Sequence, residues 1–311
     1  MKIDFKKMRP YKFNSTIFKS VEKLAKNVIK GSGNININKC LVCKSSPQKK
    51  YLIKYNIPIV TCLKCDLTYS TKQPKNFNDV YSKEEYLSKS ITSYDKTRKY
   101  RIKRFGLERI KILKKYKKKG NLLDFGCGIG WFLEGAKNYY NVSGVEFSDS
   151  IRKWLFKKLG IRTFKTLDDI KNEKYDIITA FDVIEHVPNP LDLLKQLKKK
   201  LKKNGIILIY TPNKDSLGFK FLKERNNLVC PPNHLTYFNF KSFEYMAKKA
   251  KMKIIETQYK GLDIGDIYAY LNEFGSKKKA DYLFRNSLLL QNFLDNINYS
   301  NHVRFVIKNK N

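Results

Sequence analysis

The chain has 311 residues, 42% of them hydrophobic and 14% aromatic, which is enough for one full-sized core and a small second module and excludes disorder as the main state. The 64 Lys and Arg residues exceed the 28 Asp and Glu residues by 36, so the surface attracts anions such as phosphates, glycans or acidic lipids. No apolar run approaches the roughly 20 residues that a membrane span needs, and residues 1–7 lead into charge instead of an apolar signal region. We therefore expect a cytoplasmic protein without a membrane span, with peripheral membrane contact as an alternative.

Lysine supplies most of the positive charge. Ten of the 64 basic residues are arginine, although guanidinium groups are the usual choice for bidentate recognition of phosphate. We interpret most of the excess charge as lysine on ordinary helix surfaces. A surface that binds nucleic acid is the alternative interpretation.

The N-terminal quarter of the chain divides into two predicted modules. Residues 1–38 form a basic helical lead-in that ends at a Gly-Ser-Gly-Asn break. Residues 39–75 carry two C-x2-C pairs with 18 residues between them: Cys40 and Cys43, then Cys62 and Cys65. This spacing is typical of four thiolates that bind one structural Zn²⁺ with no open position, and the β-type runs around the pairs predict a zinc ribbon. Two disulfides are the rival interpretation, which a cytoplasmic location disfavours.

Strands and helices alternate in the rest of the chain, which follows a predicted helical connector at residues 76–115. Short apolar runs alternate with helical segments of about 10 to 15 residues from residue 116 to the end. This alternation predicts an α/β domain with a mostly parallel sheet that is covered on both faces. A helical insertion is expected at about residues 264–298. The strands are expected at 121–125, 142–146, 175–181, 205–210, 252–257 and, last, 303–307.

A glycine-rich loop follows the first strand of this domain. Gly126, Gly128 and Gly130 let the backbone turn sharply and let a ligand lie against bare main chain. The spacing is G-x-G-x-G, and Trp131 stands where a nicotinamide dinucleotide site would have its last glycine. Glu146 ends the second strand, where an acidic side chain can accept both hydroxyls of a ribose. The loop and Glu146 together predict a cofactor that contains a nucleoside.

Residues 116–260 resemble the class I S-adenosylmethionine-dependent methyltransferases. The matching stretches are Leu122–Gly130, Gly144–Ser148, Tyr175–Ile178, Phe181–Val187, Asn204–Ile207 and Tyr210–Asn213. The resemblance implies a Rossmann-like, doubly wound sheet with an antiparallel last strand, preceded here by the ribbon. It also implies where S-adenosylmethionine binds: its methionine part at the glycine loop with Asp124 close by, its ribose at Glu146, and its adenine beside Asp168.

Two narrower resemblances concern the acceptor of the methyl group. The stretch Pro231–Phe238, the four-cysteine ribbon and Tyr94 of the connector are similar to zinc-ribbon-bearing methyltransferases of surface-polysaccharide and natural-product sugar pathways. The set Asp182-x-x-Glu185-His186 is similar to the ubiquinone-pathway O-methyltransferases. Both resemblances imply transfer of a methyl group, and they leave the acceptor open.

Methyl transfer to oxygen requires removal of the acceptor proton, and a histidine has a suitable pKa. Of the three histidines, His186 and His234 follow the carboxyl ends of strands, where parallel sheets bind ligands, whereas His302 lies in a late polar turn. We predict His234 as the general base, with a lid or packing role as the alternative, and His186 and Tyr94 as further catalytic candidates. Asp182, Glu185 and His186 would share one face of a helical turn, which makes Mg²⁺ an alternative to a simple hydrogen-bond network.

The sequence therefore predicts a methyltransferase that uses S-adenosylmethionine and carries a structural zinc. Its expected acceptor is a hydroxyl of a small or carrier-linked molecule, most simply a sugar in cell-surface glycan biosynthesis. The alternatives are an RNA methyltransferase acting on tRNA or rRNA, a quinone-type O-methyltransferase, and a cofactor-bound module without activity. The methylated atom and the oligomeric state stay open.

Overall fold

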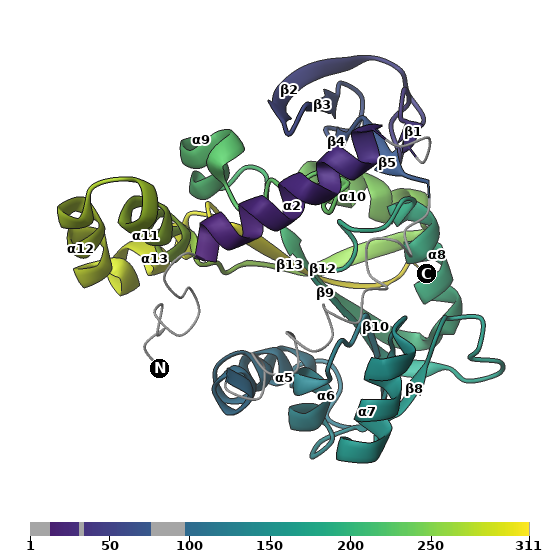
Figure 1. Ribbon diagram of the computed structural model, residues 1–311. Coiled ribbons are helices and arrows are strands. Elements are labelled where there is room, and N and C mark those ends of the chain that lie inside the picture. The colour runs from purple at the N-terminus through teal and green to yellow at the C-terminus, as the bar shows by residue number, and fades with distance from the viewer. Residues whose placement is uncertain (1–12, 31–33, 76–96, 311) are drawn as a thin grey trace.

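The computed structural model describes residues 13–30, 34–75 and 97–310. Its main sheet has seven strands in the order β12-β13-β10-β9-β6-β7-β8 (Figure 1). The bounds of these strands are β6 (Asn121–Phe125), β7 (Asn141–Val145), β8 (Arg162–Phe164), β9 (Tyr175–Phe181), β10 (Leu201–Pro212), β12 (Met252–Tyr259) and β13 (His302–Asn309). The five strands from β10 to β8 are parallel, and β13 is antiparallel to both β10 and β12. The predicted Rossmann-like sheet with an antiparallel last strand is confirmed.

Adjacent residues of the central strands supply two separate cores, one on each face of the sheet. Ile177 packs into one core and Ile178 into the other, because successive side chains of a strand point to opposite faces. One face is covered by η1 (Ile102–Gly106), α5 (Leu107–Lys114), α6 (Trp131–Ala136) and α7 (Asp149–Leu159); the other is covered by α8 (Pro190–Lys200) and α10 (Phe240–Lys249). Burial on both faces explains why these strands read as continuous apolar runs in the sequence.

Side-chain caps fix where the helices beside the site begin. Asn189 accepts a hydrogen bond from the backbone of Asp192 at the start of α8, and Pro190 occupies the first helical position, where its missing N–H is not needed. Asn239 and Ser242 form a reciprocal capping box at the start of α10. The chain segments that precede α8 and α10, which carry site residues, therefore enter these helices at defined points.

The ribbon segment forms a second sheet that also takes a strand from much later in the chain. The order of this four-stranded sheet is β11-β4-β3-β2, and a separate pair joins β1 to β5. The bounds are β1 (Asn34–Asn36), β2 (Gln48–Lys54), β3 (Ile57–Cys62), β4 (Thr68–Ser70), β5 (Lys72–Pro74) and β11 (Thr236–Tyr237). In β11, Thr236 pairs with Tyr69 and Tyr237 pairs with Thr68. The ribbon is thus joined by backbone hydrogen bonds to the chain that follows His234.

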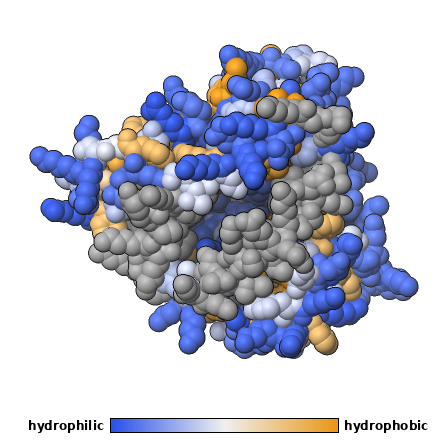
Figure 2. All heavy atoms as spheres, viewed as in Figure 1, coloured by the Kyte–Doolittle hydropathy of each residue, from blue (hydrophilic) through white to orange (hydrophobic). Residues whose placement is uncertain are grey.

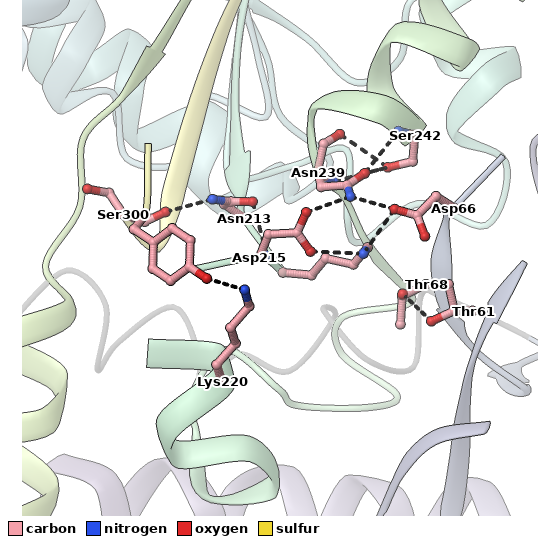
Figure 3. A network of polar contacts seen from close by, with 11 residues as sticks. Thr61, Asp66, Thr68, Asn213, Asp215, Lys220, Asn239, Ser242 and Ser300 are labelled. Atoms are coloured by element: carbon pink, nitrogen blue, oxygen red, sulfur yellow. Dashed lines mark hydrogen bonds and ion pairs between the residues drawn. The ribbon is translucent and has the colours of Figure 1, made fainter. Parts of the chain in front are cut away.

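A polar network strengthens the same junction (Figure 3). The Asn239 amide donates to Asp66 of the ribbon at 2.6 Å and to Asp215 at 2.7 Å. The Lys214 ammonium, with 9% of its side chain exposed, lies 3.2 Å from Asp66 and 3.0 Å from Asp215. One ammonium and one amide thus lie between two carboxylates, and the nearly buried charge of Lys214 has a partner on each side of the junction.

Further helices pack beside the main sheet. The N-terminal helix α2 (Phe13–Lys30) begins where the backbone N–H groups of Asn14 and Ser15 donate to Glu273 at 3.1 and 2.9 Å. The stretch expected to be a helical insertion contains α11 (Asp263–Phe274), α12 (Lys277–Arg285) and α13 (Ser287–Asn296), while α9 (Leu217–Leu222) and η2 (Lys223–Arg225) follow β10. Of the expected connector, residues 97–114 are helical, and the remainder up to residue 96 lies outside the described residues.

Hydrophilic side chains dominate the described part of one face of the molecule. In Figure 2 most of the residues drawn in colour are hydrophilic, and the hydrophobic ones lie in separate areas. Among the described helices, none combines the length and the apolar character that crossing a bilayer requires.

Candidate functional site

A cavity of about 380 Å³ opens at the carboxyl ends of the parallel strands. Asp124 and Gly126 border it at the end of β6, Asp182 at the end of β9, and Pro212 at the end of β10. In parallel sheets this edge binds ligands, because the loops that leave neighbouring strands separate there. His234 also lines the cavity, so the glycine loop and the predicted base face the same space.

The glycine loop between β6 and α6 has three left-handed residues, Gly126, Gly128 and Gly130, with φ angles of 74°, 51° and 75°. A Cβ at Gly126 would lie 2.6 Å from a Val183 methyl, and one at Gly130 would lie 2.5 Å from a Leu155 methyl. A Cβ at Gly128 would meet no atom within 4 Å. The outer two glycines are therefore required by packing and backbone, whereas Gly128 presents bare main chain to open space, as the cradle of a ligand does.

Glu146 follows β7 and holds the glycine loop in place. Its two carboxylate oxygens accept hydrogen bonds from the backbone N–H of Gly128 at 3.0 Å and of Ser148 at 2.9 Å. A carboxylate has about four lone-pair sites, so each oxygen of Glu146 can accept one more donor, such as a ribose hydroxyl. Burial raises the pKa of Glu146, and the backbone donors oppose that rise.

Asp124 is a buried carboxyl group at the wall of the cavity. It is 3% exposed and accepts a hydrogen bond from the Thr179 hydroxyl at 2.6 Å. Burial raises the pKa of Asp124 to about 7, because the low-dielectric surroundings disfavour its charged form. A positively charged ligand in the cavity would favour the carboxylate and reverse this shift.

Arg109 of α5 was not anticipated from the sequence. It is 8% exposed, and its guanidinium lies 4.7, 4.1 and 4.6 Å from the ring centres of Trp131, Phe181 and Tyr210. Among the described residues it has no hydrogen bond or ion pair, and its Nε and the Tyr210 hydroxyl are both buried without a partner. A buried guanidinium with five N–H donors and no acceptor at the wall of a cavity fits an anionic ligand.

A second arginine also lies close to the Tyr210 ring. The guanidinium of Arg304 is 4.5 Å from the ring centre and donates to Glu108 at 2.8 Å. Glu108 also accepts from Arg104 at 3.0 Å. Four of the chain's ten arginines line the cavity, although arginine is scarce elsewhere: Arg101, Arg104, Arg109 and Arg304.

His186, His234 and Glu185 come together beside the cavity. The two imidazole rings lie 4.5 Å apart, centre to centre, at an angle of 81°. Burial lowers the pKa of both histidines, and burial raises the pKa of Glu185. Glu185 and His234 line the cavity directly. The arrangement therefore places two neutral imidazoles at the edge where the sequence predicts the catalytic base.

The structure corrects the expected grouping of Asp182, Glu185 and His186. Asp182 has a φ of 56°, and its carboxylate lies 3.3 Å from Nε2 of His302 at the start of β13. Burial alone would raise the pKa of Asp182, but the contact with His302 brings it to about 2. The group of side chains close enough to share a metal ion contains His234 with Glu185 and His186, and it does not contain Asp182. His302, which the sequence places in a late polar turn, lines the cavity. The sequence missed both pairings because the partners come from distant elements.

The four ribbon cysteines converge as the sequence predicts. Their Sγ atoms all lie within 4.8 Å of one another, with 3.4 Å between Cys40 and Cys65 and between Cys43 and Cys62. None of these thiols is in a disulfide, whose S–S bond would be about 2.05 Å. Four sulfurs around Zn²⁺ at about 2.3 Å would be about 3.8 Å apart, so the cluster fits a zinc ribbon.

The remaining predicted residues lie elsewhere. Asp168 is exposed in the turn after β8 and is not among the residues that line the cavity. Its neighbour Asp169 is engaged with Thr166, whose backbone N–H donates to it at 2.7 Å. Tyr94 lies outside the described residues. Cys127 and Cys230, the two cysteines outside the ribbon, are both buried.

The family model of the methyltransferase domain matches residues 94–257, which is more than half of the chain. The chain belongs to the methyltransferase family. Its sheet, with antiparallel β13 between β12 and β10, has the class I arrangement that the sequence resemblance implies. The glycine loop and Glu146 of this methyltransferase lie within the matched residues.

Relatives of this methyltransferase cover part of its length. A ubiquinone biosynthesis O-methyltransferase of Actinobacillus pleuropneumoniae is 33% identical over 107 residues, which are 30% of this chain and 46% of the relative. An uncharacterized protein of Methanocaldococcus jannaschii is 28% identical over 160 residues, or 50% of this chain and 76% of that protein. The chain spans about half the length of the ubiquinone O-methyltransferases it matches first. The plantazolicin methyltransferase BpumL, solved with SAH, has a TM-score of 0.49 at 19% identity, over 75% of this chain and 93% of that one.

Proposed function

We propose that this methyltransferase transfers the methyl group of S-adenosylmethionine to a hydroxyl of a small or carrier-linked molecule. The observation that carries the proposal is one cavity lined by the glycine loop, Asp124 and His234, whose ring contacts that of His186. The relatives named O-methyltransferases favour oxygen as the accepting atom. A cavity of about 380 Å³ has the size of a small-molecule site.

Residues of the cavity and of the loops beside it complement the chemical groups of the cofactor. S-adenosylmethionine supplies an electrophilic methyl carbon on a sulfonium and carries an ammonium and a carboxylate. We assign the carboxylate to Arg109, whose guanidinium is buried without another acceptor among the described residues. Asp124 takes the positive end, Glu146 the ribose hydroxyls, and Asp168 the adenine. The Asp168 assignment rests on the resemblance.

The histidine pair is the group that we assign to accept the proton of the acceptor hydroxyl. Displacement at the methyl carbon is in line, so the acceptor oxygen must be held opposite the sulfur with its proton removed. His234 lines the cavity, and its lowered pKa keeps the ring neutral and able to accept a proton at neutral pH. His186 stands against it in the same cluster, and Tyr94 stays a further candidate.

We also propose that the four cysteines bind a structural zinc ion. The four thiolates form a closed tetrahedral set that leaves no position for a substrate. The ion would therefore hold the ribbon together, and its chemistry would be separate from methyl transfer.

For the acceptor we propose a sugar of a surface glycan, because the stretch Pro231–Phe238 is similar to methyltransferases of sugar pathways. Three arginines besides Arg109 line the cavity, and their net positive charge beside Glu108 suits an acceptor attached to a phosphate or another anionic carrier. A quinone-type ring and RNA are the competing acceptors. RNA is favoured by the charge excess of 36, and a quinone-type ring by the named relatives.

A labelled-methyl screen tests the proposal. The protein is incubated with methyl-labelled S-adenosylmethionine and, separately, with nucleotide sugars, a lipid-linked glycan, a catechol and total RNA. We expect label in a sugar acceptor, and we expect Glu146→Ala, which should weaken the cofactor by about 1 to 3 kcal/mol, to reduce it. Label in the catechol or in RNA alone would replace the sugar by that acceptor. No label in any acceptor by a protein that binds the cofactor would contradict methyl transfer to these classes.

A further inference from the structure

Helix α13 carries polar side chains inward and apolar side chains outward. Ser287, Gln291 and Asp295, spaced four residues apart on one face of the helix, are buried. Leu289 and Phe293 stand on the opposite face, about 200° around the helix from Gln291, and they are 73% and 58% exposed. A helix at a protein surface ordinarily has the reverse arrangement, because burial of apolar area is favourable. The apolar face of α13 is therefore a face that would gain from a binding partner.

Hydrogen bonds fix this orientation of the helix. The side-chain oxygen of Gln291 accepts from the N–H of Ile264 at 3.1 Å, and its amide nitrogen donates to Asp295 at 3.0 Å. Asp295 also accepts from the N–H of Gly261 at 3.1 Å and lies 2.7 Å from the Lys260 ammonium. Rotation of α13 about its axis would leave these buried polar groups unpaired, which is costly. The protein thus holds the apolar face of α13 toward the outside.

The neighbouring helix α12 is strongly basic. Lys277–Lys279 begin this helix and Arg285 ends it, and all four basic side chains are exposed. Asp281 is its one acidic residue, so four positive charges and one negative charge give α12 a net charge of +3. A helix of nine residues is about 13 Å long, and α13 follows after Asn286 alone, so these charges lie close to the apolar face.

We propose that α12 and α13 bind the surface of a lipid bilayer that contains anionic lipids. The apolar face of α13, with Leu288 and Tyr282 exposed beside it, would enter the boundary between headgroups and acyl chains, while the basic side chains of α12 would contact lipid phosphates. A second copy of this chain fits less well, because it would bring the same positive charge to the contact. RNA would complement the charge and leave the apolar face in water. The helices lie together at one end of the molecule, at the left of Figure 1.

The inner face of the same helix is joined to the wall of the cavity. Lys260 and Gly261, which both contact Asp295 of α13, line the cavity. A bilayer bound to the outer face of α13 would therefore lie on the side of the molecule where this wall is held. We infer that the carrier of the acceptor is a lipid, since the enzyme and its acceptor would then meet at one surface. This consequence rests on the proposed function, whereas binding to the bilayer does not.

Flotation of the full chain with lipid vesicles tests the proposal without any acceptor. We expect the protein to float with vesicles of phosphatidylcholine and about 30% phosphatidylglycerol, and to bind vesicles of phosphatidylcholine alone at least about tenfold more weakly. Leu289→Ser combined with Phe293→Ser should reduce binding to the anionic vesicles by at least about tenfold, because two apolar side chains no longer leave water. Phe156→Ser is the matched control, since this side chain is 72% exposed on α7, and it should leave binding unchanged.

A second set of variants tests the charge. Lys277→Gln, Lys278→Gln and Lys279→Gln combined should lower binding to the anionic vesicles by about fivefold for each lysine. The chain offers a matched control in Lys117–Lys119, a second run of three lysines that precedes β6 at the edge of the main sheet opposite the cavity. Replacement of these three by Gln makes the same change in net charge and should have a much smaller effect.

Folding and oligomeric state are measured on the same preparations. Circular dichroism shows that each variant is folded. Absence of flotation by the wild-type protein, or equal flotation of the wild type and the α13 variant, would overturn the proposal. A protein that does not float and forms a dimer that the α13 variant dissociates would assign the apolar face to a second copy. Flotation without methylation of any lipid-linked acceptor would count against the proposed function and leave the bilayer contact standing.

Discussion

At the scale of single residues, Asp124 couples the cofactor to pH. The pKa of Asp124 is about 7 in the free protein, so the carboxyl group is largely protonated below that pH. The positive charges of S-adenosylmethionine favour the carboxylate, so binding lowers the pKa and releases a proton when the pH is below 7. We expect the affinity to fall by up to about tenfold per pH unit below 7 and to be flat just above it. Titration between about pH 5.5 and 7.5 checks this.

The matched control is Asp124→Asn, which keeps the shape of the side chain and cannot ionise. It should bind S-adenosylmethionine weakly and without the step near pH 7. An affinity of the wild-type protein that does not change across this range would show that Asp124 does not face the positive end of the cofactor.

His234 is expected to matter for turnover and not for the cofactor. If its imidazole accepts the proton of the acceptor hydroxyl, His234→Ala should reduce turnover by about 10² to 10⁴ with unchanged affinity for S-adenosylmethionine. Because burial lowers the pKa of His234, the wild-type rate should be flat at neutral pH and fall only well below pH 6.5. Turnover and calorimetry check these outcomes. A variant that keeps more than about a third of the wild-type turnover would assign His234 to packing.

Local sequence patterns predicted the residues of the glycine loop, because these residues and Glu146 lie within one strand-helix-strand unit. Arg109 and Arg304 could not be predicted in the same way. They are 195 positions apart in the sequence, and both come close to Tyr210 only because β13 returns into the sheet next to β10. The scarcity of arginine in a lysine-rich chain was the available signal, since four of its ten arginines line the cavity.

At the scale of elements, the ribbon supports the acceptor side of the cavity. β11 begins two residues after His234 and pairs with β4, and the carbonyl of Leu235 accepts from the N–H of Ser70 at 2.9 Å. The segment that carries His234 is therefore held between the ribbon and the turn at Glu185. The glycine loop has no such contact with the ribbon in the described residues, so the two halves of the site depend on different elements.

Removal of the ribbon zinc should consequently separate cofactor binding from turnover. Cys62→Ser combined with Cys65→Ser leaves two thiolates, which cannot complete the tetrahedron. We expect loss of about one equivalent of zinc and a fall in turnover of at least about tenfold, with S-adenosylmethionine affinity within about threefold of the wild type. Elemental analysis, kinetics and calorimetry on one preparation check this. Full turnover without zinc would show that the ribbon does not position His234.

The long elements were predictable and the shortest were not. The apolar run at 175–181 coincides with β9, because burial on both faces leaves a continuous hydrophobic signal. β8 has three residues and β11 has two, too few for any periodicity to be visible in the sequence. Their positions are set by the strands they pair with. The sequence therefore indicated the ribbon and the sheet and could not indicate the strand that joins the two sheets.

For the whole molecule, the excess of positive charge makes the salt dependence of binding the measurement that distinguishes the competing acceptors. A protein that neutralises six or more phosphates of a nucleic acid loses about 10³-fold in affinity or more between 50 and 200 mM salt. A small acceptor in the cavity makes few such contacts. We expect the KM for the acceptor to change by less than about tenfold over that range, which steady-state kinetics can check. A KM that rises steeply with salt would favour RNA as the acceptor and would assign the 36 excess positive charges to binding of its phosphates.

Strand β11, which follows β10 in the chain but belongs to the ribbon sheet, also affects where this protein can be divided. The family match begins at residue 94, after the last strand of the ribbon. A polypeptide cut at that boundary would keep every strand of the seven-stranded sheet and would deprive Thr236 and Tyr237 of their partners in β4. The part that matches other methyltransferases is thus smaller than the part joined by backbone pairing, because β4 of the ribbon, which lies next to the second cysteine pair, is the partner of the strand that follows His234.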